Sequence, residues 1–250
     1  MDFFMDFFGS IGAFFMDFFG SIGAFFSGVA SDFYQTMIKD GRWLLVAEGL
    51  WTTIYIAVCA VLIGTVIGCL LALCKISKSR FLRGIANVYT TIIRGIPLAT
   101  QLMIFYFVIF APMGMDRHLV AIIGCGINSG AYVTEIFRAG IQGVDIGQTE
   151  AGRSLGLSRL QTMWRIVIPQ AVKTALPTYT SEFIALIKET SVLSFIAVMD
   201  LNKAGDMIRN ATYNAWMPLL SIAAIYLLLT FGLTKLFAIL ERRLARSDRG

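Results

Sequence analysis

Residues 145–169 read DIGQTEAGRSLGLSRLQTMWRIVIP and form a polar interval between two long apolar runs. The spacing of a capping box, in which two side chains satisfy the free amides of a first helical turn, occurs twice: in Asp145 with Gln148, and in Ser158 with Gln161. Gly156 is expected to end a first short helix in a left-handed conformation, and Pro169 to end or kink a second. The interval is therefore predicted to be an ordered hairpin, and its partly apolar surface needs a partner to bury it.

The chain around this hairpin has the composition of a membrane protein. Of its 250 residues, 57% are hydrophobic and 15% are charged, whereas soluble domains have about 45–50% apolar and about 25% charged residues. Its mean hydropathy is +0.73. The four cysteines all fall in apolar runs, without the spacing of a disulfide framework or a zinc site: Cys59, Cys69, Cys74 and Cys125. This composition excludes a secreted disulfide scaffold and a free cytosolic enzyme.

Five apolar segments are long enough to cross a bilayer, since a helix needs about 20 mostly apolar residues to span the hydrocarbon. They cover residues 50–74, 85–112, 119–144, 171–198 and 210–240. The fourth is the least apolar, because it contains Glu182, Lys188 and Glu189. The predicted fold is an all-α integral membrane protein with five transmembrane helices.

The basic residues predict how these helices are oriented. Most of the 21 Lys and Arg residues lie between the first and second segments, between the third and fourth, and after the fifth. Short cytoplasmic loops carry such an excess of Lys and Arg. We therefore expect the N-terminus outside and the C-terminus in the cytoplasm, so that the net charge of +5 is concentrated on the cytoplasmic side.

The N-terminal segment contains a tandem repeat. Residues 5–15 recur identically at 16–26, after a partial copy at 1–4. At 3.67 residues per turn an 11-residue repeat stacks almost in line on a helix, with one face made of Phe7, Ile11, Phe14, Phe18, Ile22 and Phe25. This favours a helix in the membrane interface, although the usual Lys and Arg are missing from its polar face. A tolerated duplication without a specific role is the alternative, and a signal peptide is disfavoured because no basic residue precedes Lys39.

The hairpin also carries fixed residues at a characteristic spacing: Glu150, Ala151, Gly152, Gly156, Ile166, Ile168 and Pro169. These resemble the EAA loop of ABC-importer permeases. The family pattern has Ala at the position of Gly152 and Leu at that of Ile168, and both differences conserve size. The resemblance implies a type I ABC-importer permease fold for a transmembrane domain at residues 49–243. Outside it, we expect an extracytoplasmic or interfacial segment (1–48) and a cytoplasmic tail (244–250).

The resemblance extends over about residues 50–243 and is closest to the polar amino acid branch of the family. Residues 89–102, with Arg94, Gly95, Pro97 and Gln101, are similar to the Arg-Gly-x-Pro segment of that branch. Residues 129–141, and residues 188–191 followed by Asp200 and Leu201, are similar to it as well. The implied substrate is a polar amino acid or a related molecule, and the mixed intramembrane charge favours a charged one.

The resemblance also implies a division of labour. The chain has no GxxxxGK[ST] phosphate loop, so a separate ATPase would bind ATP and Mg²⁺, while this subunit is not an enzyme and holds no cofactor. The ATPase-coupling residues carried over are Glu150, Ala151, Gly152, Gly156, Ile166 and Pro169. The implied partners are two ATPase subunits, a second identical or homologous permease, an extracytoplasmic amino acid-binding protein docking near residues 116–118 and 200–213, and membrane lipid, but no nucleic acid. The implied location is the bacterial inner membrane, as a multi-pass protein.

Ionisable groups within the predicted spans indicate a polar pathway, because each costs about 2.5–3.5 kcal/mol to insert. The candidate substrate-pathway residues are Arg94, Gln101, Tyr132, Glu135, Lys188 and Glu189. Glu135 or Glu189 would bind an ammonium group, and the others would donate to a carboxylate. Two structural alternatives stay open: an ion pair of Glu135 with Arg138, and an Arg94 side chain that reaches the cytoplasmic headgroups. Lys188 and Glu189 are expected near the middle of the fourth span.

Two other classes of protein share some of these sequence features. An ATP-independent carrier or channel is the alternative, since it too would use intramembrane charges. An intramembrane serine hydrolase is disfavoured, because Ile127 stands where a GxSG motif at Ser129 needs Gly and the single His118 is expected in an outer loop.

Overall fold

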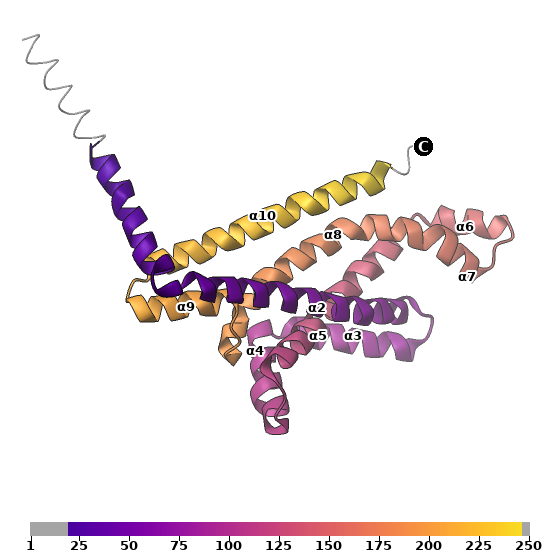
Figure 1. The fold of residues 1–250 in the computed structure, drawn as a ribbon. Coiled ribbons are helices and arrows are strands. Elements are labelled where there is room, and N and C mark those ends of the chain that lie inside the picture. Colours follow the sequence, from indigo (N-terminus) through magenta and orange to yellow (C-terminus); the bar gives the residue numbers. More distant parts are fainter. Residues whose placement is uncertain (1–19, 247–250) are drawn as a thin grey trace, which may run out of the picture.

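The structure is a computed structural model that describes residues 20–246, and that part of the chain is almost entirely helical (Figure 1). A first helix covers residues 20–33. It is followed by α2 (Trp43–Ile76), α3 (Arg80–Gly95), α4 (Leu98–Met103), α5 (Arg117–Gln142), α6 (Ile146–Ser154), α7 (Arg159–Thr162), α8 (Ile168–Glu189), α9 (Leu201–Thr212) and α10 (Trp216–Arg246). Short π or 3-10 segments join them: Tyr34–Ile38, Lys39–Gly41, Ile104–Phe110, Ala111–Met113, Met163–Val167 and Thr190–Ile196.

Three helices of the described chain are long and apolar enough to cross a membrane: α2, α5 and α10. A fourth candidate is the pair Arg80–Gly95 and Leu98–Met113, which is bent by 101°. Helices α2, α5 and α10 correspond to the first, third and fifth predicted segments, and the bent pair corresponds to the second. The fourth predicted segment corresponds to α8, which is too polar to meet the same criterion. The five-span prediction is thus confirmed for three helices, and for four if the bent pair is one span.

The bend between α3 and α4 follows from Pro97. A residue before proline is driven out of the helical region, and Ile96 is accordingly extended, with φ −112° and ψ 132°. The side-chain amide of Gln101 donates to the Ile93 carbonyl at 2.5 Å and to the Ile96 carbonyl at 2.7 Å. Gln101 thereby satisfies carbonyl groups that the break releases in an apolar environment.

Close packing of α2 against α5 forms the centre of the molecule. Each helix presents two glycines four residues apart, Gly64 and Gly68 on α2 and Gly126 and Gly130 on α5. A Cβ atom at Gly126 would lie 2.9 Å from Ile63 Cγ2, and one at Gly130 would lie 2.8 Å from Ile67 Cγ2. Small residues at this spacing let membrane helices approach closely. Around this contact the largest buried core is formed by Ile56, Ala60, Val61, Leu102, Ala121, Cys125, Leu186, Leu193, Ile196 and Val198.

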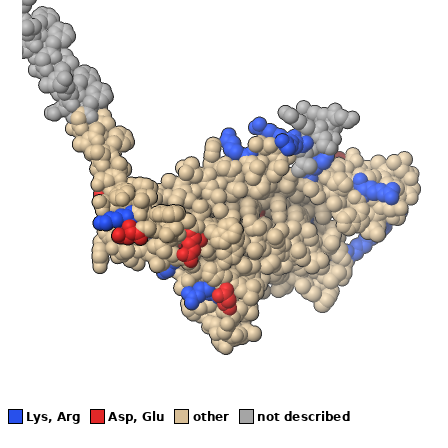
Figure 2. Space-filling view, in the orientation of Figure 1, with Lys and Arg blue, Asp and Glu red and all other residues tan. Residues whose placement is uncertain are grey.

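The two ends of the helical bundle differ in charge. Figure 1 places α6 and α7 at the same end as the C-terminus of α10, and α9 and the N-terminal helix at the other end. In Figure 2, most of the blue Lys and Arg side chains in view lie towards the α6–α7 end and the C-terminal end of α10, whereas most of the red acidic side chains lie towards the opposite end, with a few blue ones beside them. The charge asymmetry of the sequence is therefore an asymmetry along the axis of the bundle.

Candidate functional site

Local capping builds the hairpin of α6 and α7. Ser158 and Gln161 form a complete capping box at the start of α7, and Gly156 has the predicted left-handed conformation, with φ +81°. Asp145 caps α6 by accepting from the Gly147 amide at 2.6 Å. Both predicted helix starts are confirmed, but the predicted box with Gln148 is wrong.

The hairpin is joined to α8 by side chains and by continuous helix. Gln170 of α8 donates to the Gln148 side chain at 3.2 Å, which is why Gln148 does not return to its own helix start. Pro169 was predicted to end or kink the second helix, and the helix does not end there, because the backbone stays helical through the π-helical segment Met163–Val167 into α8.

Gly152 is the buried residue of α6, and the second arm of the hairpin packs on it. A Cβ atom at Gly152 would lie 2.7 Å from Ile166 Cδ1 and 2.8 Å from Thr162 Cγ2. Gly152 and Ile166 therefore form the internal contact of the hairpin. Of the other predicted coupling residues, Glu150, Ala151, Gly156 and Pro169 are exposed.

The outer surface of the hairpin carries large apolar side chains among polar and basic ones. Four large side chains from both arms are more than half exposed: Ile146 at 74%, Leu155 at 81%, Leu160 at 68% and Trp164 at 61%. Contiguous exposed apolar surface on a protein marks an interaction site. Because Glu150 is exposed on the same helix, this surface offers apolar contacts together with a carboxylate that can accept charge-assisted hydrogen bonds.

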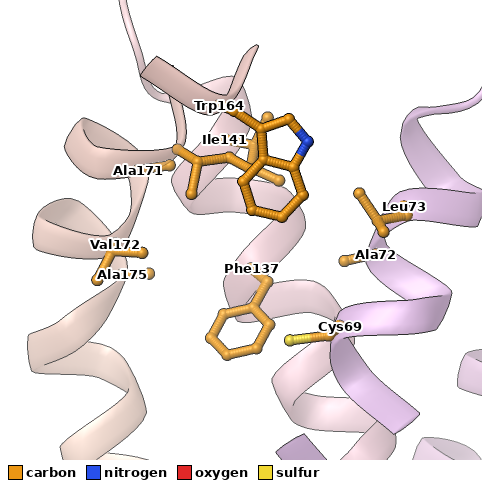
Figure 3. Close-up of a pocket in the computed structure, with 10 residues that line it drawn as sticks. Cys69, Ala72, Leu73, Phe137, Ile141, Trp164, Ala171, Val172 and Ala175 are labelled. Carbon is orange, nitrogen blue, oxygen red and sulfur yellow. The ribbon is translucent and has the colours of Figure 1, made fainter. Parts of the chain in front are cut away.

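An apolar cavity of about 230 Å³ lies at the root of the hairpin, between α2, α5 and α8 (Figure 3). Trp164 and Phe137 point into it, with Cys69 and Leu73 of α2 on the opposite side. Its lining is almost free of polar groups, so this cavity does not suit a polar solute. It leaves free space beside the hairpin root.

Glu135 belongs to a cluster of ions that joins three helices. Arg138 Nε lies 2.7 Å from Glu135 Oε2, which confirms the predicted ion pair. Lys75 of α2 pairs with the other carboxylate oxygen and also donates to Thr90 of α3 at 2.7 Å. Both oxygens of Glu135 are therefore engaged by cations of the protein. These contacts favour a structural role for Glu135 over the role of a substrate ligand. The sequence did not indicate Lys75 as a partner of Glu135, because the two residues are 60 positions apart.

Arg94 and Tyr132 meet at the bend between α3 and α4. The Arg94 guanidinium carbon lies 5.1 Å from the centroid of the Tyr132 ring, within the range of a cation–π interaction. Glu182 of α8 is close enough to interact electrostatically with Arg94. The cluster of Arg94, Tyr132 and Glu182 thus presents both signs of charge at the end of α3. Glu182 was expected among the charges of the fourth predicted segment, but not as a substrate ligand.

Two predicted pathway residues lie elsewhere than expected. Lys188 and Glu189 are not in the middle of a helix, since α8 ends at Glu189 and a 3-10 turn, Thr190–Ile196, follows. Both are exposed, and Glu189 interacts electrostatically with Glu182. Gln101 is buried with its amide already donating to two backbone carbonyls, so it is not the predicted free donor for a carboxylate.

The part of the chain that carries these features matches a known protein family. Residues 60–246 match the family described as the binding-protein-dependent transport system inner membrane component. The chain belongs to this family of ABC-importer permeases. The matched region contains the hairpin, the ion cluster and the Arg94–Tyr132–Glu182 cluster, and it begins after the N-terminal repeat.

Individual members of the permease family are similar over most of their length. The chain is 41% identical to the "Putative glutamine transport system permease protein GlnP" of Rickettsia bellii, over 84% of this chain and 98% of the relative. It is 38% identical to the arginine transport system permease protein ArtQ of Bacillus subtilis, over 81% and 94% of the two chains. These relatives are named as transport subunits and not as enzymes.

Solved structures agree with the permease fold. A crystal structure of an amino acid ABC transporter with histidines superposes with a TM-score of 0.78, at 39% identity over 84% of this chain and 98% of that one. An inward-facing MetNI methionine ABC transporter shares the fold at 18% identity, with a TM-score of 0.72. The predicted type I ABC permease fold is therefore confirmed.

Proposed function

We propose that this permease forms half of the translocation pathway of an ATP-driven importer for a polar amino acid. An extracytoplasmic binding protein delivers the substrate, and two separate ATPase subunits bind ATP and Mg²⁺. A second permease, identical or homologous, completes the pathway in the bacterial inner membrane. The observation that carries the proposal is the ordered hairpin with an exposed apolar surface at the basic end of the bundle.

The proposed orientation places the hairpin and the C-terminus of α10 in the cytoplasm and the N-terminus outside. The gathering of Lys and Arg at the hairpin end supports it (Figure 2). In this orientation α8 is the fourth of five crossings, and α10 is the fifth. Its polar residues, including Glu182, would then face the pathway and not lipid, because unpaired charge is costly in hydrocarbon.

The exposed face of the hairpin, with Ile146, Leu155 and Leu160, is the proposed docking surface for the ATPase. Nucleotide-driven closure of the ATPase pair would move this surface. Contact of Gly152 with Ile166 holds the two arms together, and the Gln148–Gln170 hydrogen bond ties them to α8. The hairpin and the inner part of α8 should therefore move as one body.

Close contact between α5 and α8 carries this movement to the pathway. A Cβ atom at Gly140 of α5 would lie 2.8 Å from Ala175 Cβ and 2.9 Å from the Ala171 carbonyl oxygen of α8. The same two helices carry Tyr132 and Glu182 further along. A shift of the hairpin root would thus change the distances among Arg94, Tyr132 and Glu182, with the apolar cavity at the root giving room for the shift.

An amino acid substrate fits the charges of this cluster. Glu182 can bind an ammonium group, and Arg94 with the Tyr132 hydroxyl can donate to a carboxylate. The names of the relatives, which include glutamine, arginine and L-cystine permeases, support an amino acid as the substrate class. We assign the selection among amino acids to the binding protein together with this cluster.

The test is ATP hydrolysis by the reconstituted complex of permease, ATPase and binding protein. Each amino acid is offered in turn with the binding protein. The proposal predicts that at least one polar amino acid raises the hydrolysis rate above that with unloaded binding protein. A rate that no amino acid changes would contradict it, as would uptake that persists without the ATPase, which is the behaviour of an ATP-independent carrier.

A further inference from the structure

The N-terminal helix, residues 20–33, contributes nothing to the pathway described above, yet its two faces differ sharply. At 100° per residue, the large apolar side chains fall within an arc of about 100°: Ile22, Phe25, Phe26, Val29 and Phe33. The rest of the circumference carries only Gly, Ala, Ser and Asp32. Such a division is typical of a helix that lies between an apolar and an aqueous phase.

The apolar face of this helix is open. Phe25 and Phe26 are exposed by 66% and 65%. The other face has no neighbours either, since a Cβ atom at Gly20, Gly23 or Gly28 would meet no other atom within 4 Å. Figure 1 shows why, since the helix leaves the α9–α10 end of the bundle at an angle to the spanning helices. Within the described part of the chain, its free end therefore has no protein to bury its aromatic residues.

The last turns of the helix fix the direction in which its apolar face points. Val29 and Phe33 line one groove together with Trp43 at the start of α2 and Trp216 and Leu220 at the start of α10. In the most apolar 18-residue stretch of α10, only 6% of the stretch is buried within the protein, as expected for a helix that faces lipid. The apolar face of residues 20–33 is thus continuous with a surface that meets the bilayer.

Two tryptophans in this groove indicate how deep the helix lies in the membrane. Trp43 and Trp216 begin the two spans that flank the groove, and tryptophan is enriched where spanning helices meet the headgroups. A helix that joins the spans at this level, at an angle to them, lies near the surface of the membrane and not across it.

We propose that residues 20–33 bind the lipid surface at the outer end of the permease, with Phe25 and Phe26 inserted among the lipids. The helix has no Lys or Arg and one Asp, so attraction to anionic headgroups does not contribute. Binding rests on apolar burial alone and does not depend on anionic lipid. The 11-residue repeat extends the same sequence pattern towards the N-terminus, with Phe18, Phe14 and Phe7 in phase.

The test is photo-crosslinking of the full-length chain in vesicles of phosphatidylcholine. Phe25 is replaced by p-benzoylphenylalanine, and replacement of Ser27 on the opposite face is the matched control. The photoreactive residue at position 25 is expected to form lipid adducts, and the one at position 27 is expected to form few or none. Phe26 and Ser31 form a second matched pair, which guards against a local disturbance by either replacement.

The lipid composition and the identity of the adduct make the outcome decisive. Addition of phosphatidylglycerol should leave the yield at position 25 unchanged. Adducts of position 25 with a second copy of the chain would show that a protein interface covers this face, and would overturn the proposal. Equal lipid adducts at positions 25 and 27, or none at position 25, would overturn it as well. None of these outcomes depends on ATP or on the transported substrate.

Discussion

Gly68 of α2 lies so close to Val133 of α5 that a Cβ atom at position 68 would be 2.5 Å from Val133 Cγ1 and 2.7 Å from Val133 Cβ. The contact joins the two helices at the centre of the bundle, and the absence of a side chain makes it possible. Gly68→Ala should therefore force the helices apart and cost about 1–3 kcal/mol of stability, as overpacking of a filled core does. Thermal unfolding of the purified permease in detergent measures the loss.

Gly84→Ala is the matched control for this prediction. Gly84 lies in α3, and a Cβ atom there would meet no other atom within 4 Å. Alanine is favoured over glycine inside a helix by about 1 kcal/mol, so Gly84→Ala should keep or raise the unfolding temperature. Equal effects of the two substitutions would contradict the close-packing account.

The ion cluster around Glu135 predicts a structural phenotype. The Lys75 side chain is only 8% exposed, and Glu135→Leu would leave it without its carboxylate. Removal of one partner from a buried ion pair costs about 3–5 kcal/mol. Glu135→Leu should thus lower the unfolding temperature strongly, and adding Lys75→Met should recover part of the loss.

Lys78 is exposed, so Lys78→Met is the control for the charge change at Lys75. It should leave the unfolding temperature unchanged. The KM for uptake separates the structural role of Glu135 from a role in binding. A stable Glu135→Leu permease with a raised KM would restore Glu135 to the substrate pathway and refute the structural assignment.

Leu155 tests the docking surface of the hairpin. It is one of the most exposed apolar side chains of the described chain, so Leu155→Glu should not change the unfolding temperature. It should weaken binding of the ATPase by about 2 kcal/mol or more, roughly 30-fold in Kd, if it is an interface hot spot. Tyr213 is exposed by 95% at the opposite end of the bundle, and Tyr213→Glu should leave ATPase binding intact. The prediction fails if both variants bind the ATPase equally well.

Glu182 tests the polar cluster. Glu182→Gln keeps the size of the side chain and removes the charge that faces Arg94. Loss of a charge-assisted hydrogen bond of about 1.5–3 kcal/mol would raise the KM for uptake by roughly 10- to 100-fold, while ATPase binding stays as in the wild type. Glu48→Gln, on the exposed surface of α2, should leave KM unchanged. An unaltered KM for Glu182→Gln would remove Glu182 from the pathway.

Features decided by neighbouring residues could be predicted from the sequence. Ser158 and Gln161 cap a helix start through atoms three residues apart, and Gly156 meets a purely local requirement for a left-handed backbone. Apolar length alone located α2, α5 and α10. The EAA-type spacing then identified the family, because it samples fixed points along one hairpin.

Features decided by tertiary contacts could not be predicted in this way. Gln148 bonds to Gln170 across the hairpin instead of to its own helix start. Gln101 was predicted to line a pathway, but its amide is held by the carbonyls that Pro97 releases. The GxxxG pairs of α2 and α5 are an exception, because this sequence pattern does indicate which two helices pack closely at the centre.

The most direct test of the central claim is amino acid uptake into vesicles that contain the permease, its ATPase and external substrate-loaded binding protein. Uptake is measured with ATP inside, without ATP, and with ATP and the Leu155→Glu permease. The account predicts that the amino acid accumulates when ATP is present with the unsubstituted permease. It predicts no accumulation without ATP or with the Leu155→Glu permease. Accumulation that is equal in all three conditions would contradict the account, because transport would then need neither nucleotide nor the hairpin.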